Sequence, residues 1–276
     1  MKKILSLLLA VVMLAGCTLA LASCGLFGPT LKVGYTVYAP MNYFDNDGDL
    51  ADGDDGSGDF VGFDTELAKL VGEKLGMKVK FVEIQWDNKY MELESGAIDC
   101  IWNGFTSNTK DADGIERGDK VDFTYAYLDN AQCVVVKSEN LAAYTSAASL
   151  AGKTGTAENG SAGETYAKSV TTEFEGVPAQ TDVFREVKSG AVDFAVIDRL
   201  LADNIVGKGD YASLSIVEAI EIEKEVYSIG CKKGGDLDEK INEALVELLN
   251  EGKIEALAAK YNVRVTDTLM AKKTAE

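Results

Sequence analysis

Residues 95–99 read Ser-Gly-Ala-Ile-Asp, and nearly the same five letters return at residues 189–193 as Ser-Gly-Ala-Val-Asp. Each copy follows a stretch with helical spacing and leads into an apolar run. In both copies the glycine is suited to end a helix in a left-handed turn, and the Ile or Val to begin a strand. The repeat therefore predicts two similar α/β lobes, with corresponding strands that end near Asn103 and Asp198.

The chain around the first copy alternates strands with helices. A helix capped by Asp64 or Thr65 and stopped by Gly76 lies between predicted strands, and a second helix runs from about residue 87 to 95. This βαβαβ order predicts a mainly parallel sheet with helices on both faces. The predicted strands cover residues 31–37, 79–84 and 97–102.

Two extended stretches, residues 132–137 and 225–231, fit the connections of a two-strand hinge between the lobes. The C-terminal helices, about residues 237–261, would then pack on the first lobe. Ligands of parallel sheets bind beyond the carboxyl ends of the strands, so the site is expected where the lobes face each other. The predicted domains are lobe 1, residues 25–134 and 229–276, and lobe 2, residues 135–228.

The N-terminus predicts an export signal over residues 1–24. Its apolar run, residues 4–15, is too short for a comfortable membrane span. Two small-residue sites ending in cysteine follow, and both resemble the bacterial lipobox, in which the cysteine becomes the lipidated first residue. We favour Cys24, because cleavage at Cys17 would leave the apolar residues 18–21 exposed. The expected location is the outer face of the cytoplasmic membrane or the periplasm, with a lipid anchor as the membrane contact; a plain secretory signal is the alternative.

The composition argues against several classes of function. The sequence has no histidine, which removes Ser-His-Asp and Cys-His nucleophilic sites and imidazole metal sites. A net charge of −18 argues against a nucleic-acid partner, because phosphate contacts need stripes of Lys and Arg. Cys100, Cys133 and Cys231 lack CxxC spacing and are expected as mostly buried thiols, with one disulfide between two of them as the alternative.

The segment Gly-Phe-Asp-Thr-Glu-Leu at residues 62–67 resembles the signature of the bacterial extracellular solute-binding proteins of family 3, which are receptors for polar amino acids. The resemblance implies a two-lobed periplasmic-binding-protein (Venus-flytrap) fold. It also implies a monomeric, non-enzymatic component of an ABC importer, without a cofactor, which closes on an amino acid and docks on a membrane permease. Further matching segments keep their order along the chain, at residues 86–87, 95–99, 104–106, 116–117, 121–123, 134–136, 160–161 and 196–198.

The resemblance also implies ligand-binding residues. Arg117 matches the arginine that grips the ligand α-carboxylate, since a guanidinium is permanently charged and offers two parallel donors. Asp198 matches the acid that accepts the α-ammonium. The other matched positions are Gly104 and Thr106 at the ammonium end, Ser161 at the start of a helix facing the carboxylate, and the aromatic pair Tyr38 and Trp86 around the ligand side chain. Without the resemblance, Arg117 would be interpreted as a solvated cation of a loop. Asp198 and Ser161 would be interpreted as helix caps, and the two aromatic residues as part of the core.

Three features leave alternatives open. Glu158 aligns with a pocket-lining position and would favour a basic ligand side chain, whereas Asn42 would favour a neutral polar one. About six extra residues, near 108–114, precede Arg117 and would be able to displace it. The acidic segment 45–59 is expected as a solvated hairpin or open loop, with a calcium site as the alternative.

Two other functions compete with transport. The same fold hosts a lyase acting on cyclohexadienyl substrates, which would need a protonated carboxylic acid, and Glu158 is the candidate. A sensor that reports a ligand to a membrane partner without transport is the second competitor.

Overall fold

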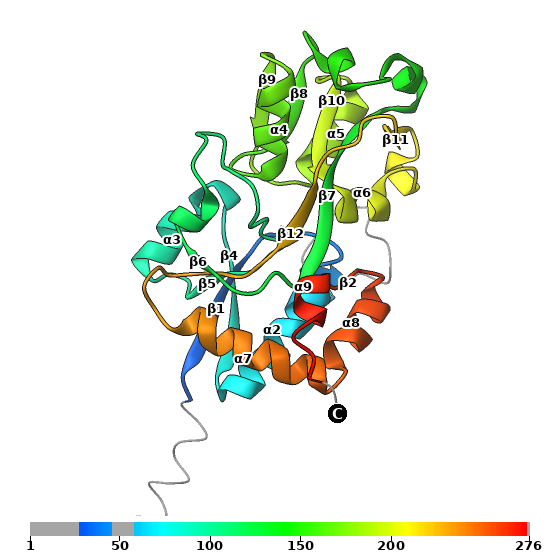
Figure 1. Ribbon diagram of the computed structural model, residues 1–276. Coiled ribbons are helices and arrows are strands. Elements are labelled where there is room, and N and C mark those ends of the chain that lie inside the picture. The colour runs from blue at the N-terminus through cyan, green and yellow to red at the C-terminus, as the bar shows by residue number, and fades with distance from the viewer. Residues whose placement is uncertain (1–27, 46–57, 275–276) are drawn as a thin grey trace, which may run out of the picture.

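The computed structural model describes residues 28–45 and 58–274. The predicted signal, both candidate lipidation cysteines and most of the acidic loop, with its calcium alternative, lie outside the described residues. Two sheets, each flanked by helices, form a lower lobe 1 and an upper lobe 2 in Figure 1. The predicted two-lobed α/β fold is confirmed.

The sheet of lobe 1 has the order β4-β1-β5-β13-β6, in which β1 pairs in parallel with β4 and β5, and β13 pairs antiparallel with β5 and β6. A short antiparallel pair, β2 with β3, lies beside it. The strands are β1 (Thr30–Tyr35), β2 (Tyr43–Asp45), β3 (Asp59–Val61), β4 (Lys78–Glu83), β5 (Cys100–Ile101), β6 (Asp122–Phe123) and β13 (Gly230–Cys231). The helices are α2 (Phe63–Leu75), α3 (Lys89–Ser95), α7 (Leu237–Asn250), α8 (Lys253–Tyr261) and α9 (Asp267–Met270), with the 3-10 turns η2 (Trp86–Asn88) and η3 (Arg117–Asp119).

The sheet of lobe 2 has the order β11-β7-β10-β8-β9, with β8 parallel to β9 and β10. The strands are β7 (Leu128–Lys137), β8 (Gly155–Glu158), β9 (Phe174–Val177), β10 (Phe194–Asp198) and β11 (Leu214–Ile216). The helices are α4 (Ala162–Val170), α5 (Asp182–Ser189) and α6 (Arg199–Ile205), with the 3-10 turns η4 (Ser138–Ala143), η5 (Ala147–Leu150) and η6 (Gly209–Tyr211).

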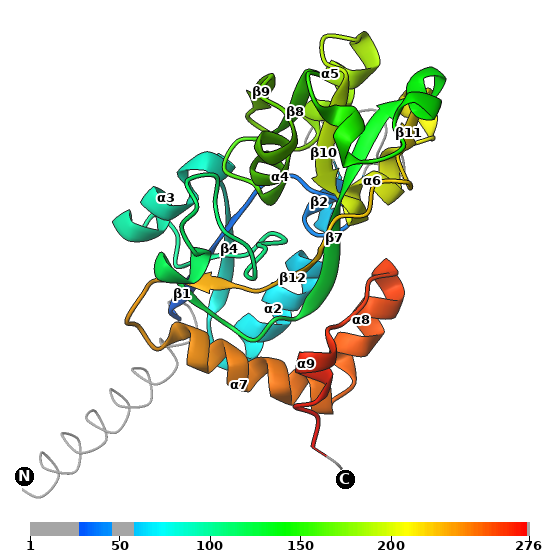
Figure 2. The ribbon, with the colours of Figure 1, turned by 45° about the horizontal axis from the view of Figure 1, so that its top comes forward.

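The strands that run between the lobes are β7 and β12 (Lys224–Tyr227), which pair antiparallel along residues 128–131 of β7. The upper part of β7 continues into the sheet of lobe 2 by pairing with β10 and β11. Figures 1 and 2 both show β7 and β12 side by side between the lobes. Of the stretches predicted for the hinge, residues 225–227 lie in this connection. Residues 132–137 pair with β10 and β11 in lobe 2, and residues 230–231 form β13 in lobe 1, so the first crossing lies a few residues earlier than predicted.

The repeated pentapeptide has the same structure in both lobes. Helices α3 and α5 end at Gly96 and Gly190, whose φ angles are 74° and 82°. In both copies the aspartate carboxylate accepts a hydrogen bond from a backbone N–H at a parallel strand, Asp99 from Lys32 at 2.8 Å and Asp193 from Thr154 at 2.9 Å. The repeat therefore ties a helix end to a sheet once in each lobe, as predicted.

The core of lobe 1 lies between α2 and the C-terminal helices. Leu67 and Val71 of α2 and Leu245 and Leu248 of α7 are fully buried in one hydrophobic cluster. Burying such a side chain contributes roughly 1.5–3 kcal/mol. The C-terminal helices therefore pack against α2 of lobe 1, and Figure 2 shows them along the lower edge of the molecule.

Some elements differ from those predicted. The strand expected at residues 97–102 is reduced to β5, and α9 was not predicted. Neither Asp64 nor Thr65 caps α2, because the helix begins earlier and its N-cap is Gly62, with a φ of 125°. A Cβ at Gly62 would lie 2.1 Å from the Met41 carbonyl oxygen, so only glycine fits there.

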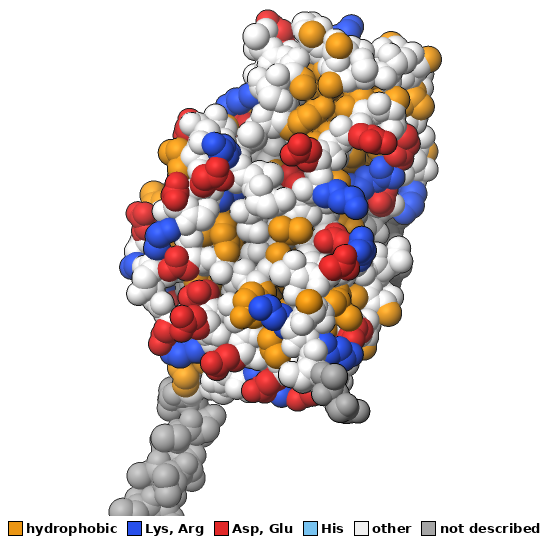
Figure 3. Space-filling view, viewed as in Figure 1, with side chains coloured by type: hydrophobic (Ala, Val, Ile, Leu, Met, Phe, Trp, Pro, Cys, Tyr) orange, Lys and Arg blue, Asp and Glu red, His pale blue; other side chains and the backbone are white. Residues whose placement is uncertain are grey.

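The cysteines of the described residues are buried thiols, and charged side chains lie on the surface. Cys100, Cys133 and Cys231 are buried and free. Over residues 28–45 and 58–274, no helix has the length and apolar character needed to cross a membrane. Acidic and basic side chains are interspersed over the face shown in Figure 3.

Candidate functional site

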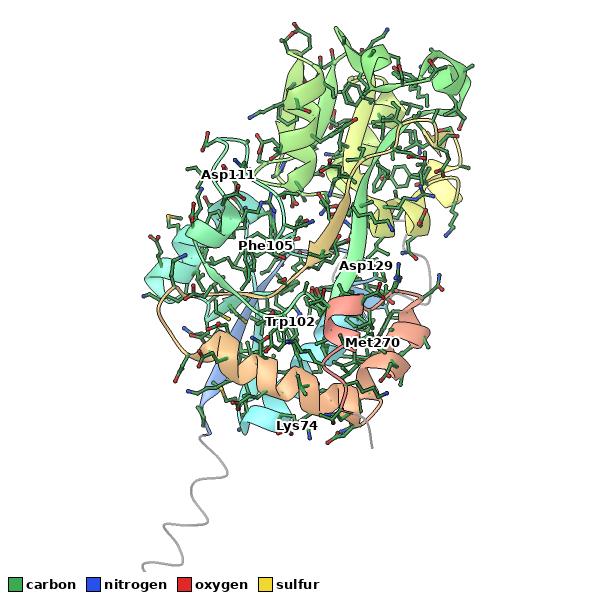
Figure 4. All side chains as sticks on the ribbon, viewed as in Figure 1. Lys74, Trp102, Phe105, Asp111, Asp129 and Met270 are labelled. Carbon is green, nitrogen blue, oxygen red and sulfur yellow. The ribbon has the colours of Figure 1, made fainter. Side chains whose placement is uncertain are left out.

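The two lobes touch through polar contacts. Lys89 Nζ in lobe 1 donates to the Gly160 carbonyl oxygen in lobe 2 at 2.9 Å. Thr165 Oγ1 on α4 donates to the Lys110 carbonyl oxygen at 3.4 Å. Lys110 belongs to the loop that carries Asp111, which Figure 4 shows rising beside lobe 2. The predicted site residues lie around this junction.

Arg117 is the main cation of the site. Its side chain is 1% exposed, and its Cζ lies 5.6 Å from the centroid of the Phe105 ring. Nη1 donates to the Thr106 carbonyl oxygen at 3.2 Å, while the buried Nε and Nη2 have no hydrogen-bond partner among the described residues. Burial lowers the pKa of Arg117, but a guanidinium stays charged at neutral pH. A buried cation with two free donors is suited to bind a carboxylate.

The inserted loop before Arg117 forms a closed turn. Its ends are joined by the paired Lys110 and Glu116, and the Asp111 backbone N–H donates to the Ile115 carbonyl oxygen at 2.9 Å. The extra residues therefore form a turn that closes on itself, and Arg117 contacts Phe105 and Thr106 in the segment that follows β5.

Asp198, at the carboxyl end of β10, accepts hydrogen bonds from neutral groups only. Oδ1 accepts from Asn130 at 2.6 Å, from Gln132 at 2.8 Å and from the Tyr227 hydroxyl at 2.8 Å, while Oδ2 accepts from Gln180. Burial raises the pKa of Asp198, and these hydrogen bonds partly oppose the increase. Asp198 has no salt bridge within the described residues, so it is suited to attract a cation.

Tyr38 and Gly104 lie beside this carboxylate. The Tyr38 and Tyr227 hydroxyls are 2.7 Å apart, which connects Tyr38 to Asp198 through Tyr227. Gly104, with a φ of 58°, leaves room for no side chain, because a Cβ there would lie 2.6 Å from the Tyr38 ring. Its backbone N–H donates to the buried carboxylate of Asp64 at 2.9 Å.

Trp86 packs edge-on against Phe105, with the ring centroids 5.4 Å apart. The ammonium of Lys89 lies over Trp86, 4.9 Å from its centroid, and donates to the Trp86 carbonyl oxygen at 3.1 Å. Burial and the nearby Arg117 lower the pKa of Lys89 to about 7. One face of Trp86 is thus already occupied by a cation from the chain itself.

Ser161 caps α4. Its Oγ accepts from the Glu164 backbone N–H at 3.0 Å, as the sequence predicts. The Glu164 carboxylate reaches back to the Gly160 backbone N–H at 2.6 Å, one residue earlier than in the usual capping box.

Glu158, at the end of β8, is 2% exposed. Its Oε1 and the side-chain oxygen of Gln180 are both buried without a hydrogen-bond partner among the described residues. Burial and the nearby Asp198 raise the pKa of Glu158 to about 8. These two oxygens can accept hydrogen bonds from N–H groups.

The Asn42 side chain forms its hydrogen bonds within lobe 1. Its amide nitrogen donates to Thr65 Oγ1 at 2.9 Å, and its oxygen accepts from the Asn103 amide at 2.7 Å. Both groups are used inside lobe 1, which removes the support for Asn42 as a selectivity residue.

Four further polar residues of the junction were missed: Lys89, Gln180, Glu225 and Tyr227. A signal existed for two of them, because Glu225 and Tyr227 alternate in an extended stretch and alternate residues face one side. For Lys89 the sequence holds no such signal, since its burial depends on Gly160 of the other lobe.

Comparisons with known proteins agree with this geometry. The family model described as bacterial extracellular solute-binding proteins, family 3, matches residues 31–264. The arginine-binding extracellular protein ArtP of Bacillus subtilis is 27% identical over 273 residues, which cover 95% of this chain and 98% of the relative. A solved ancestral arginine-binding protein bound to glutamine is 32% identical, with a TM-score of 0.74 over 85% of this chain and 98% of that structure.

Two other findings bear on location and chemistry. The model of a prokaryotic membrane lipoprotein lipid attachment site matches residues 1–18. This range includes Cys17 and ends before Cys24. The ancestral amino acid-binding protein AncCDT-1, a precursor of cyclohexadienyl dehydratase, is 27% identical, with a TM-score of 0.69 over 84% of this chain and 95% of that structure.

Proposed function

The chain belongs to the bacterial extracellular solute-binding proteins of family 3, and from this premise we propose that Arg117 and Asp198 hold the two charged ends of an amino acid between the lobes. The protein is the exported, lipid-anchored binding component of an ABC importer for amino acids. Its partner is the membrane permease of that importer, on which the closed form docks. The proposed lobe boundaries are those predicted from the sequence; the first lies within β7 and the second just after β12.

The observation that carries this proposal is the pair of free donors on Arg117. An unpaired buried donor costs about 1–3 kcal/mol, and more when it is charged. A ligand carboxylate satisfies both donors at once through two parallel hydrogen bonds. The anion expected at this position is the α-carboxylate, because Asp198 is placed to receive the α-ammonium.

The two proposed ligand-binding residues lie in different lobes, which gives the ligand a means to favour lobe closure. Arg117 belongs to lobe 1 and Asp198 to lobe 2. A ligand that bridges them binds the closed form better than the open form, which is the differential affinity that a conformational shift requires.

We further propose that the ligand side chain carries N–H donors. Glu158 Oε1 and the side-chain oxygen of Gln180 are free, buried acceptors in lobe 2. Arginine, lysine and glutamine all offer N–H groups, and a cation would in addition be attracted to the Glu158 carboxylate. Lys89 opposes that attraction, so the charge preference needs a direct test.

The test is thermal unfolding of the purified mature protein with each common amino acid added singly at millimolar concentration. A ligand that binds only the folded state raises the melting temperature. We expect an increase with one or more of arginine, lysine and glutamine. No increase with any amino acid, in folded protein free of carried-over ligand, would reject the proposal.

Citrulline separates charge from hydrogen bonding, because it replaces the guanidinium of arginine by a neutral urea that keeps N–H donors. If Glu158 selects a charge, wild type prefers arginine to citrulline, and Glu158→Gln loses most of this preference. Equal affinities of wild type for arginine and citrulline would show that Glu158 and Gln180 recognise the N–H groups of the ligand and not its charge.

We also propose that the protein binds its ligand without converting it. A dehydratase on this scaffold would use Glu158 as a protonated acid. The pKa of Glu158 is raised, as such an acid requires, so we would test the protein for dehydratase activity. Unchanged cyclohexadienyl substrate in the presence of purified protein is the expected outcome; turnover would establish the lyase.

A further inference from the structure

A second carboxylate, that of Glu225, lies beside Asp198. The strand register explains why: Asp198 on β10 is directly opposite Gln132 on β7, and Glu225 on β12 is directly opposite Asn130. Because alternate residues of a strand point to the same side, Asn130 and Gln132 present their amides together. The two carboxylates therefore flank the same pair of amides.

These amides bind both carboxylates at once. The Gln132 amide nitrogen is 2.8 Å from Asp198 Oδ1 and 2.9 Å from Glu225 Oε2. The Asn130 amide nitrogen is 2.6 Å and 3.3 Å from the same two oxygens. Two oxygens that share two donors lie less than two hydrogen-bond lengths apart. Both side chains are nearly buried, and neither has a salt bridge within the described part of the chain.

Glu225 also orients Thr106. The Thr106 hydroxyl donates its single proton to Glu225 Oε2 at 3.1 Å, while the Thr106 carbonyl oxygen accepts from Arg117. Because the Thr106 O–H donates its hydrogen bond to Glu225, the lone pairs of Oγ1 can accept a hydrogen bond from another group. Glu225 Oε1 accepts no hydrogen bond from any described residue, so it too is free to receive one.

We propose that Glu225 is a second carboxylate of the ammonium-binding position, so that the ligand α-ammonium is held between Asp198 and Glu225. This inference rests on the proposed amino-acid-binding function. An ammonium has three donors and no acceptor, and Asp198, Glu225 and Thr106 offer acceptor oxygens that are connected by hydrogen bonds around Glu225 Oε2. Because Glu225 lies on the hinge strand β12, the ammonium would contact the hinge as well as both lobes.

A change in protonation follows from this arrangement. Burial and the nearby Asp198 raise the pKa of Glu225 to about 7, and burial also raises the pKa of Asp198. A bound ammonium favours the ionised form of both, so binding near pH 7 releases protons and affinity rises from pH 6 to pH 8. The other titratable or charged groups around the pair are Arg117, Tyr38, Tyr227, Glu158, Lys89 and Asp64.

The experiment is isothermal titration calorimetry at pH 7 in two buffers of different ionisation enthalpy, with L-glutamine and L-arginine as probes. Wild type should release protons on binding. Glu225→Gln should bind at least about tenfold more weakly and release fewer protons. The matched control is Glu223→Gln, at an exposed glutamate just before β12 that the site does not use, and it should keep the affinity and the proton release of wild type.

A purely structural role for Glu225 makes a different prediction. In that case Glu225→Gln would change the melting temperature of the ligand-free protein but leave affinity and proton release as in wild type, which would overturn the inference. If wild type itself binds no amino acid, the proposed function fails instead, so the two failures are distinguishable.

Discussion

At the scale of single residues, the site is defined by groups whose hydrogen-bonding capacity is unused. Arg117 keeps two free donors, and Glu158 and Gln180 keep free oxygens, although all three side chains are buried. In native proteins nearly all buried polar groups have hydrogen-bond partners. Several unpaired donors and acceptors at the junction of the lobes therefore indicate where a ligand would supply the missing partners.

The geometry of Arg117 predicts the result of a conservative substitution. Arg117→Lys keeps the charge but loses the planar fork, so we expect an affinity loss of about tenfold or more, equivalent to about 1.4 kcal/mol per tenfold. Titration calorimetry with the best ligand of the thermal screen measures it. Arg185→Lys is the matched control, because Arg185 is an exposed residue of α5 whose partners are Asp182 and Glu186. Wild-type affinity in Arg117→Lys would show that the bidentate contact is not made.

At the scale of elements, the repeated turn after α3 and α5 carries the same strain-free glycine in both lobes. A Cβ at Gly96 has no atom within 4 Å, and one at Gly190 meets only the flexible end of Lys137. The positive φ angles, not crowding, therefore set the cost of a side chain at both positions.

We expect Gly96→Ala and Gly190→Ala each to lower the free energy of unfolding by about 1 kcal/mol, because each forces an L-residue into the left-handed region. Chemical denaturation measures the loss. Gly118→Ala is the control, since Gly118 has no positive φ and open space around its Cα, and it should be close to neutral. A cost confined to one of the two lobes would contradict the equivalence of the turns.

At the scale of the whole molecule, buried carboxylates gather where the lobes and hinge meet. Burial raises the pKa of Asp64 to about 6, of Glu158 to about 8 and of Glu225 to about 7. The sequence has no histidine, so no imidazole titrates in this range. The ligand-free protein therefore holds protons near neutrality that the unfolded chain has already released.

The sign of the pH dependence follows. Between pH 5 and 7 the folded state binds more protons than the unfolded state, so the stability of the ligand-free protein falls as pH rises. Lys89, with its pKa lowered to about 7, begins to act in the opposite direction as the pH approaches that value, but it is one group against several carboxyl groups. We expect the melting temperature to be higher at pH 5.5 than at pH 7, and a bound amino acid to reduce this difference. A ligand-free melting temperature that rises from pH 5.5 to pH 7 would contradict the assignment.

The sequence by itself determined the two-lobed α/β architecture, because apolar periodicity, the glycine stops and the repeated pentapeptide are local signals. The resemblance to family 3 also predicted Arg117, Asp198 and Glu158 as ligand-binding residues, and the proposed function rests on that prediction. Tertiary structure alone decided that Asn42 is used inside lobe 1, that Lys89 bonds across to Gly160, and that Glu225 and Asp198 share the amides of β7. The physical reason is that burial and hydrogen-bond partners come from residues far apart in the chain, which no local pattern specifies.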